Sequence, residues 1–446
     1  MDFNAFKQAV AAAAAAAGIQ DYELYYVSAE SLSVGAFQHE INKFTSAVEG
    51  GVCLRCLVNG RMGYASTEAL DAANAAALVR RAADNAAVLE TDEPEFLVEG
   101  GQSYRELPGE QQPMPAAEQL IGMVLAGQDS LYANGAIDGS SGMAFAERSV
   151  VAISNSRGLD LYRENTVTGC MAAAVVTDGQ EKANEYKRQV KPFAELDVNA
   201  NAAEAVAKAR AKLGADVAPT GSWPIVFSPN AMTQLLGTYA GVFSAENALK
   251  GLSMLKGKEG EVIAAPCVTL VDDPFYAESP MPMPFDAEGS PTVCKNVIEN
   301  GVLNTLLYNL RTAAAAGRTT TGNAAKASYD SAVGIRPFTL YLAPGSVSEE
   351  ELLAGIEKGV YVNNLGGLHA GANTISGDFS LQSAGFMIEN GKLGAPVRSF
   401  TVAGNFFGLL KGVTAVASNT ELSGAGGITA FASPSVLVNG LSVAGK

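Results

Sequence analysis

The sequence has few of the residues that usually carry chemistry in enzymes. Its 446 residues include only two histidines and five cysteines. An odd number of widely spaced cysteines does not suit a disulfide framework and favours a reducing compartment. Basic residues are also few, with 30 Lys and Arg against 46 Asp and Glu, for a formal net charge of −16. So acidic a chain is not expected to bind nucleic acid or an anionic membrane directly.

Long apolar runs are missing as well. No run reaches the roughly 18 residues that a membrane-spanning helix needs. The first segment, MDFNAFKQAVAAAAAAAGIQ, lacks the basic start of an export signal. Its alanines favour a short soluble helix that ends at Gly18. We therefore expect a cytoplasmic protein.

The remaining pattern predicts an α+β protein built from three units. Residues 1–90 read as an N-terminal antiparallel sheet with helices, and residues 91–115 as an acidic linker rich in Pro and Gly. Residues 116–215 form a middle α+β unit. Residues 222–446 form a large, Gly-rich and mainly β C-terminal domain.

Hydrophobic periodicity places the expected elements within these units. The expected strands cover residues 22–28, 31–39, 43–49, 52–58, 61–66, 142–154, 159–176, 262–271, 338–342, 386–389 and 397–402. The expected helices after the first cover residues 67–89, 116–132 and 201–213. Asn-Gly pairs at 59–60, 300–301 and 390–391 predict tight hairpin turns, and Ser348 with Glu351 predicts a capping box.

Two short motifs look like metal or redox sites but do not fit their expected elements. Cys53 and Cys56 spell C-x-x-C inside the apolar run GVCLRCLVNG. Residues three apart on a strand face opposite sides, so the two sulfurs are expected to diverge. His39 and Glu40 begin an HE dipeptide on an expected strand, and no second histidine completes it. We interpret both motifs as structural.

The second histidine, His369, lies in the Gly-rich segment LGGLHAGANTISGDFS near Asp378. A histidine and a carboxylate can begin a metal site or act as a general base. No second His or suitably spaced Cys accompanies them. The chain also lacks the G-x-S-x-G, Walker A and dinucleotide-binding motifs, so the sequence assembles no catalytic set.

Two acidic pairs stand among prolines and glycines, Asp272 with Asp273 and Asp286 with Glu288. Paired carboxylates can bind a cation or do acid–base work. In a Pro- and Gly-rich context they more often form Asx turns and caps. We expect this structural role for both pairs.

The stretch IVFSPNAMTQLLGTYAGVF, residues 225–243, has a strong helix start. Ser228 is a good N-cap, and Pro229 suits the first helical position. A helix that follows a strand in this way offers a platform for catalytic groups. Yet no His, Cys, Asp or Glu occurs before Glu246. The polar residues that this helix presents are Asn230, Thr233, Gln234 and Thr238.

Several motifs of the C-terminal unit occur in the order and spacing of a known family. They are VTLVDDPF, PFDAEGSPT, VIENGVLNTLLYN, TTTGNA, TISGDFSLQSAGFMIENGKLGAPV and TVAGN. With them the chain resembles the TldD/PmbA family, also called TldD/TldE or modulator of DNA gyrase. The resemblance covers nearly the whole chain and is strongest over residues 222–410.

This resemblance implies a cytosolic metalloprotease built from two related chains. The D-type chain carries HExxxH on a helix and a further Cys ligand near its C-terminus, and the motif Glu activates the metal-bound water. The D-type motif would fall within residues 229–239 and the Cys within residues 419–434. Neither segment of this chain has the ligands. The chain thus resembles the PmbA/TldE type, with no catalytic or metal-binding residue of its own, and a D-type partner would carry zinc.

Two hypotheses follow. In the first, the chain is a non-catalytic subunit that is inactive alone and pairs with an HExxxH-bearing relative to degrade or process unfolded peptides. A surface near His369, Asp378, Phe379 and Ser380 would then meet peptide by strand addition, although SGDFS also fits a tight turn into a core strand. In the second, it is a homodimeric peptide- or protein-binding scaffold without peptidase activity. A stand-alone hydrolase around His369 is a weaker third. The sequence does not indicate a natural substrate.

Overall fold

A computed structural model describes residues 1–90, 94–107, 112–423 and 428–446 of the chain. Residues 91–93 and 108–111 of the expected linker, and residues 424–427 near the C-terminus, lie outside the described residues. Within the described ranges, no helix is long and apolar enough to cross a membrane.

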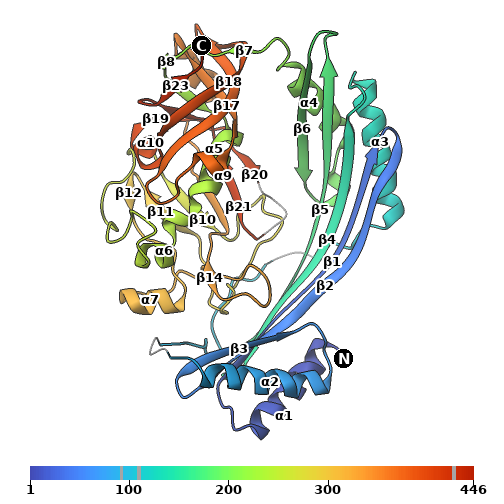
Figure 1. The fold of residues 1–446 in the computed structure, drawn as a ribbon, viewed down its shortest axis with the longest axis vertical. Coiled ribbons are helices and arrows are strands. Elements are labelled where there is room, and N and C mark those ends of the chain that lie inside the picture. Colours follow the sequence, from blue (N-terminus) through green and yellow to red (C-terminus); the bar gives the residue numbers. More distant parts are fainter. Residues whose placement is uncertain (91–93, 108–111, 424–427) are drawn as a thin grey trace.

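A long, curved antiparallel sheet forms the N-terminal half of the molecule (Figure 1). Its strand order is β3-β2-β1-β4-β5-β6. The strands are β1 (Tyr22–Phe37), β2 (Glu40–Val58), β3 (Arg61–Thr67), β4 (Ser141–Asn155), β5 (Asp160–Thr177) and β6 (Lys182–Val190). Because β1 pairs along its length with both β2 and β4, the first two expected units share one sheet.

The strands differ from their expected lengths for physical reasons. Four short strands were expected between residues 22 and 58, but β1 and β2 run almost without a break because each continues the other's ladder. His39 lies in the turn between them, with a φ of 61°, so placing it on a strand was wrong. Its Nδ1 lies 2.9 Å from Asp129 Oδ1, which docks the hairpin tip on a helix. Strand β6 was missed because charged and polar residues make up most of it, so it lacks the apolar alternation that signals a strand.

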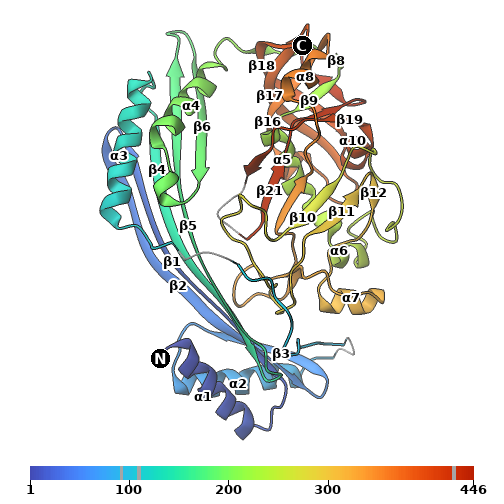
Figure 2. The ribbon, with the colours of Figure 1, turned by 180° about the vertical axis from the view of Figure 1, so that it is seen from behind.

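Helices cover the two ends of this sheet (Figures 1 and 2). The helices α1 (Phe3–Ala16) and α2 (Ala72–Ala87) pack together at one end, and α3 (Ala117–Ala133) and α4 (Val198–Arg210) pack together at the other. Helix α2 begins five residues later than expected, because Thr67 still pairs with β2 and Asp71 provides the N-cap. Helix α4 begins earlier than expected, at the N-cap Asp197. A short 3-10 turn, η1 (Phe193–Glu195), precedes it.

The C-terminal half contains a nine-stranded sheet, a six-stranded sheet and a small hairpin. Its strands are β7 (Asp216–Val217), β8 (Gly221–Ser222), β9 (Ile225–Phe227), β10 (Leu270–Asp273), β11 (Lys295–Glu299), β12 (Val302–Leu303), β13 (Ala324–Ala325), β14 (Gly334–Ile335), β15 (Thr339–Leu342), β16 (Lys358–Gly366), β17 (Asp378–Glu389), β18 (Lys392–Asn405), β19 (Val413–Val416), β20 (Glu421–Ser423), β21 (Ala430–Ser433), β22 (Val436–Val438) and β23 (Ser442–Ala444). Its helices are α5 (Pro229–Tyr239), η2 (Ala240–Phe243), α6 (Ala245–Leu249), α7 (Leu310–Ala316), α8 (Glu349–Ala354), α9 (Leu368–Gly371) and α10 (Phe406–Gly412).

The predicted α+β class is confirmed, with helices beside an N-terminal sheet and a β-rich C-terminal region. The local turn signals are also confirmed. All three Asn-Gly pairs have positive φ at both residues, as a type I′ turn requires. Ser348 and Glu351 form the predicted capping box of α8. The strand expected over residues 262–271 was wrong, because only its end joins a sheet, as β10.

The two cysteines of the C-x-x-C motif, Asp286 and Asp273 have the structural roles that were expected. Cys53 and Cys56 lie in separate apolar clusters and form no disulfide. Asp286 Oδ1 accepts the N–H groups of Glu288 and Ser290, each at 2.9 Å, which makes an Asx turn. In the other pair only Asp273 caps local backbone, since its Oδ1 accepts the N–H of Phe275. Asp272 differs from the expectation, because its Oδ1 accepts the N–H of the distant Phe338 and its Oδ2 pairs with Lys295 at 2.9 Å.

A buried ion cluster joins the long sheet to the C-terminal half. Arg55 of β2 donates from Nε to Glu23 Oε1 of β1 at 2.8 Å, and its Nη1 lies 3.9 Å from Glu288 Oε1. All three side chains are buried. Burial raises the pKa of Glu23 and Glu288 above the ordinary range, while the charge of Arg55 opposes that rise. Burial and the nearby Glu288 also raise the pKa of Asp286.

These raised pKa values predict a pH dependence of stability. The folded state holds protons that the unfolded chain releases near pH ~4, so the free energy of unfolding falls as pH rises through the raised folded values. The variant Glu288→Gln removes one carboxylate from the pair and should lose less stability on that rise, by roughly 1 kcal/mol. Urea unfolding at mildly acidic and mildly alkaline pH measures the difference.

Glu350→Gln, on the exposed start of α8, is the matched control and should keep the wild-type pH dependence. An equal pH slope in the wild type and Glu288→Gln would contradict a raised pKa of Glu288 in the folded state.

Candidate functional site

Helix α5 begins as the sequence predicted. The buried strand β9 leads into Ser228, whose Oγ accepts the N–H of Ala231 at 3.2 Å, and Pro229 takes the first helical position. One face of the helix packs in the main apolar core through Met232, Leu235 and related residues. The opposite face therefore decides what chemistry the helix supports.

The polar side chains on that face bind the neighbouring strand β16. Asn230 Nδ2 donates to the carbonyl oxygen of Asn363 at 2.9 Å. Gln234 donates from Nε2 to Asn364 Oδ1 at 3.1 Å and accepts the N–H of Leu365 on Oε1 at 2.9 Å. A bulge in β16 between Val362 and Asn364 brings these groups within reach. The side-chain amides of Asn230 and Gln234 thus hold α5 against β16 by hydrogen bonds.

The two threonines bond within the helix itself. Thr233 Oγ1 donates to the carbonyl of Asn230, and Thr238 Oγ1 donates to the carbonyl of Gln234, each at 2.8 Å. Amide and hydroxyl groups used in this way are poor substitutes for the His, Cys and carboxylate ligands of zinc. Among the residues that the structure describes, no group of three or more His, Cys, Asp or Glu is placed to hold a metal ion.

The C-terminal segment 419–434 lies against α5, although residues 424–427 of it are outside the described part. Strands β20 and β21 contact the helix, and a Cβ built on Gly237 would lie 3.3 Å from the ring of Phe431. Residues 229–239 and 419–434, which are far apart in the sequence, are therefore neighbours in space.

An open cleft lies beyond the end of β16. Gly367, with a φ of 74°, turns the chain into the short helix α9. Residues 370–375 and 378–380 line the cleft. The cleft is bordered by α9, which carries the exposed His369, and by the start of β17. The structure therefore brings His369, Asp378 and Ser380 to one region.

Asp378 is fixed as an ionised group at this cleft. Its Oδ1 accepts from Asn405 Nδ2 at 2.9 Å, and its Oδ2 accepts from Ser376 Oγ at 2.8 Å. These hydrogen bonds lower the pKa of Asp378, so the exposed carboxylate is negative at neutral pH. Ser380 is also exposed, whereas the Phe379 ring is buried and only 5% exposed.

The start of β17 has limited room for strand addition. Along its length β17 pairs with β18, and from Gln382 onward it also pairs with β16. The stretch before Gln382 faces the α9 segment, which makes one bridge between Ala372 and Phe379. A peptide strand at this position must therefore add beside that bridge or replace it.

Tyr239 joins α5 to the cleft. Its hydroxyl donates to the carbonyl of Asp378 at 3.0 Å, and its ring stacks on Phe406 with centroids 4.4 Å apart. Asn405 also caps α10, because its Oδ1 accepts the N–H groups of Phe407 and Gly408. Sequence reasoning missed both residues, although the motif TVAGN ends on Asn405 and an Asn before an apolar run is an N-cap signal.

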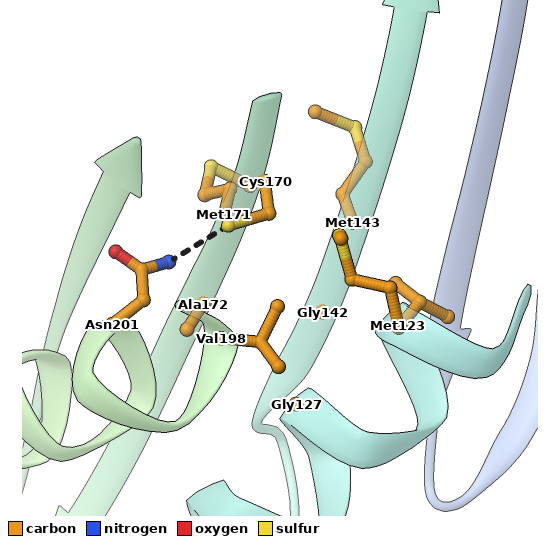
Figure 3. Close-up of a pocket in the computed structure, with 10 residues that line it drawn as sticks. Met123, Gly127, Gly142, Met143, Cys170, Met171, Ala172, Val198 and Asn201 are labelled. Atoms are coloured by element: carbon orange, nitrogen blue, oxygen red, sulfur yellow. Dashed lines mark hydrogen bonds between the residues drawn. The ribbon is translucent and has the colours of Figure 1, made fainter. Parts of the chain in front are cut away.

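A second, small cavity lies in the N-terminal half between α3, α4 and β5 (Figure 3). Methionine and aliphatic side chains line most of it, and Asn201 Nδ2 lies 3.7 Å from Cys170 Sγ. Burial raises the pKa of Cys170 to about 11, so the thiol is protonated and a poor nucleophile. With no charged group in its lining, this cavity offers no catalytic chemistry.

The α5 contacts give a testable expectation. Gln234→Met keeps the length of the side chain but leaves the Leu365 N–H and the Asn364 side chain without this partner, at a cost of roughly 1–3 kcal/mol in unfolding free energy. Thr238→Ala removes only a bond within the helix and is the control, with a change of about 0.5 kcal/mol or less. Urea unfolding of both variants measures the difference, and equal stabilities would contradict the packing role of Gln234.

Comparison with known proteins identifies the family. The family model described as the PmbA/TldA metallopeptidase C-terminal domain matches residues 220–445. The models for domain 1 and the central domain match residues 22–86 and 114–213. An uncharacterized protein of Methanocaldococcus jannaschii is 27% identical over 391 residues, which are 87% of this chain and 89% of that protein. The metalloprotease PmbA of Escherichia coli O157:H7 is 28% identical over 198 residues, 44% of this chain and 41% of that protein.

Two solved structures have the same fold. A protein of Thermotoga maritima, described as a candidate modulator of a DNA gyrase, is 30% identical with a TM-score of 0.90, over 99% of this chain and 100% of its own. TldE of Thermococcus kodakarensis is 22% identical with a TM-score of 0.89 over the same shares, and that likeness shows the fold alone. The three matching domain models together place this chain in the PmbA/TldD metallopeptidase family.

Proposed function

We propose that this chain is a PmbA/TldE-type, non-catalytic subunit of a family metallopeptidase. The observation that carries the proposal is the polar face of α5, where amides and hydroxyls are used in packing contacts. A peptidase of the HExxxH kind needs two His on such a helix to hold zinc and a Glu to activate water. In this arrangement a D-type partner chain carries zinc and performs the cleavage.

The contribution of this chain is to bind and position unfolded peptide. The cleft presents the ionised Asp378 beside the exposed Ser380. A fixed carboxylate attracts a peptide amino terminus or a basic side chain, and an extended segment adds beside the Ala372–Phe379 bridge or replaces it. The Tyr239 hydroxyl donates to the backbone carbonyl of Asp378, and Asn405 donates to its carboxylate. These two hydrogen bonds restrict the position of the carboxylate that would bind the peptide.

A cytoplasmic location belongs to the same proposal. All five cysteines are free thiols, and Cys267 and Cys294 are exposed. Exposed free thiols persist in a reducing compartment and tend to oxidise outside it.

A homodimeric binding scaffold without peptidase activity is the second candidate. One observation favours it: along residues 41–51, β2 is a partly apolar edge of the long sheet with which no strand of the described part of the chain pairs except β1. Such an edge suits association with another copy of the chain.

The test is reconstitution with an HExxxH-bearing relative from the same cell. Each chain alone, and the two together, are assayed for mass, bound zinc and cleavage of an unfolded peptide, with and without a chelator. We expect cleavage only when the D-type chain is present, abolished by the chelator, with zinc bound in proportion to the D-type chain. A D-type chain whose motif Glu is changed to Gln is the control, and it should form the complex without cleaving.

Chelator-sensitive cleavage by this chain alone would overturn the non-catalytic assignment. Stable self-association with no complex and no cleavage beside any D-type relative would favour the scaffold.

A further inference from the structure

A segment at the end of α6 turns its apolar side chains outward. We call residues 249–258, LKGLSMLKGK, the basic loop. Leu249 and Leu252 are each 43% exposed, and Met254 is 51% exposed. Ser253 between them is only 5% exposed, and its Oγ donates to a main-chain carbonyl at 2.6 Å. The loop therefore buries a hydroxyl and exposes the apolar side chains on both sides of it, which reverses the usual order.

Hydrogen bonds hold the backbone of the basic loop in this arrangement. Gly251, with a φ of 75°, ends α6, and the N–H of Leu252 donates to the carbonyl of Asn247 at 2.7 Å. The N–H of Leu255 donates to Ser253 Oγ at 3.2 Å, and the Leu255 side chain packs in the main apolar core. Because the main chain is already ordered, binding through the exposed side chains costs little main-chain entropy.

The charges that the basic loop presents are positive. It contains Lys250, Lys256 and Lys258 and no acidic residue. Lys250 pairs with Glu246, whereas no carboxylate in the described part of the chain forms an ion pair with Lys256 or Lys258. The next acid along the chain, Glu259, is itself paired with an arginine at 2.7 Å. Two unpaired ammonium groups therefore lie beside the exposed apolar side chains.

The basic loop lies apart from the cleft of the candidate site. In both views α6 is on the side of the C-terminal half that is turned away from the long sheet (Figures 1 and 2). The residues that line the cleft are 370–375 and 378–380, and none of them belongs to the basic loop. The loop is thus a second surface, separate from the surface to which peptide binding is assigned.

Composition favours a lipid surface over a protein as the occupant. The buried centres of protein interfaces are enriched in aromatic residues and Arg and depleted of Lys. The basic loop has no aromatic residue, and lysines are its only charged residues. Aliphatic side chains beside lysines suit the border of a membrane, where the apolar groups enter the acyl region and the ammonium groups meet anionic headgroups.

We propose that the basic loop is a reversible contact site for an anionic phospholipid surface. The apolar side chains of Leu249, Leu252 and Met254 enter the interface, and Lys256 and Lys258 bind the phosphate groups. The net charge of −16 excludes strong attraction of the whole chain to such a surface, but it does not describe a local patch of opposite sign. The contact is therefore weak and sensitive to salt. It needs no peptide, metal or D-type chain, and it goes beyond the proposed function.

Vesicle binding by the full chain tests the charge requirement. At low ionic strength, we expect sedimentation with vesicles of equal parts phosphatidylglycerol and phosphatidylcholine, but not with phosphatidylcholine alone. The double variant Lys256→Gln, Lys258→Gln should lower the partition coefficient roughly tenfold or more. The matched control is Glu261→Gln, which removes an exposed charge of the opposite sign close by and should not weaken binding.

A second pair of variants tests the apolar requirement. Leu252→Asn with Met254→Gln keeps every charge and should lower the partition coefficient by roughly fivefold or more, because less apolar surface leaves water. Val88→Asn is the control, because Val88 is 78% exposed but lies at the end of α2, far along the chain from the basic loop.

A fluorescent label tests insertion directly. In a background with Cys267→Ser and Cys294→Ser, Met254→Cys carries an environment-sensitive dye. Its emission should shift to the blue when the mixed vesicles are added, whereas the same dye on Val88→Cys should not respond. The remaining cysteines are buried, so the label stays at the chosen position.

Equal binding to both kinds of vesicle, unchanged binding by both double variants, or no blue shift at position 254 would overturn the proposal. Binding of soluble polyglutamate without binding of vesicles would also overturn it and would assign the loop to an acidic protein segment. No readout uses peptide cleavage or a partner chain, so failure of this proposal is distinguishable from failure of the proposed function.

Discussion

The buried arginine of β2 is the constraint on which the arrangement of the two halves depends. Arg55 lies between Glu23 of the long sheet and Glu288 of the C-terminal half, with all three side chains out of water. Removing charges from water is costly, and the cost is offset only while each charge keeps its partner. The contact between Arg55 and Glu288 therefore favours the observed position of the sheet against the C-terminal half. The cleft and the open edge of β2 are then fixed relative to each other.

The apolar face and the polar face of helix α5 have different structural roles. The start of α5 is strong and its apolar face is deeply packed. Its polar face binds β16 through Asn230 and Gln234, and its last residue, Tyr239, supports the cleft at Asp378. A helix in this position of the family fold thus contributes to stability and to the shape of the site.

Local signals in the sequence were dependable where a few neighbouring residues decide the outcome. The Asn-Gly turns, the capping box of α8 and the divergent pair Cys53 and Cys56 were predicted correctly for this reason. The lengths of β1 and β2 were predicted too short. The pairing of β1 with β2 continues through residues that look like turns in the sequence. The polar strand β6 was missed because its pairing with β5, rather than its own pattern, makes it a strand.

The sequence by itself determined the fold class, the family motifs and the absence of ligands on α5, because each depends on residue types at short spacing. Tertiary structure alone decided which distant residues meet. The hydrogen bonds from Asn405 and Tyr239 to Asp378 span 27 and 139 positions in the chain. The open edge of β2 exists because β3 is too short to cover it. Such features follow from chain geometry over long separations, which no local pattern encodes.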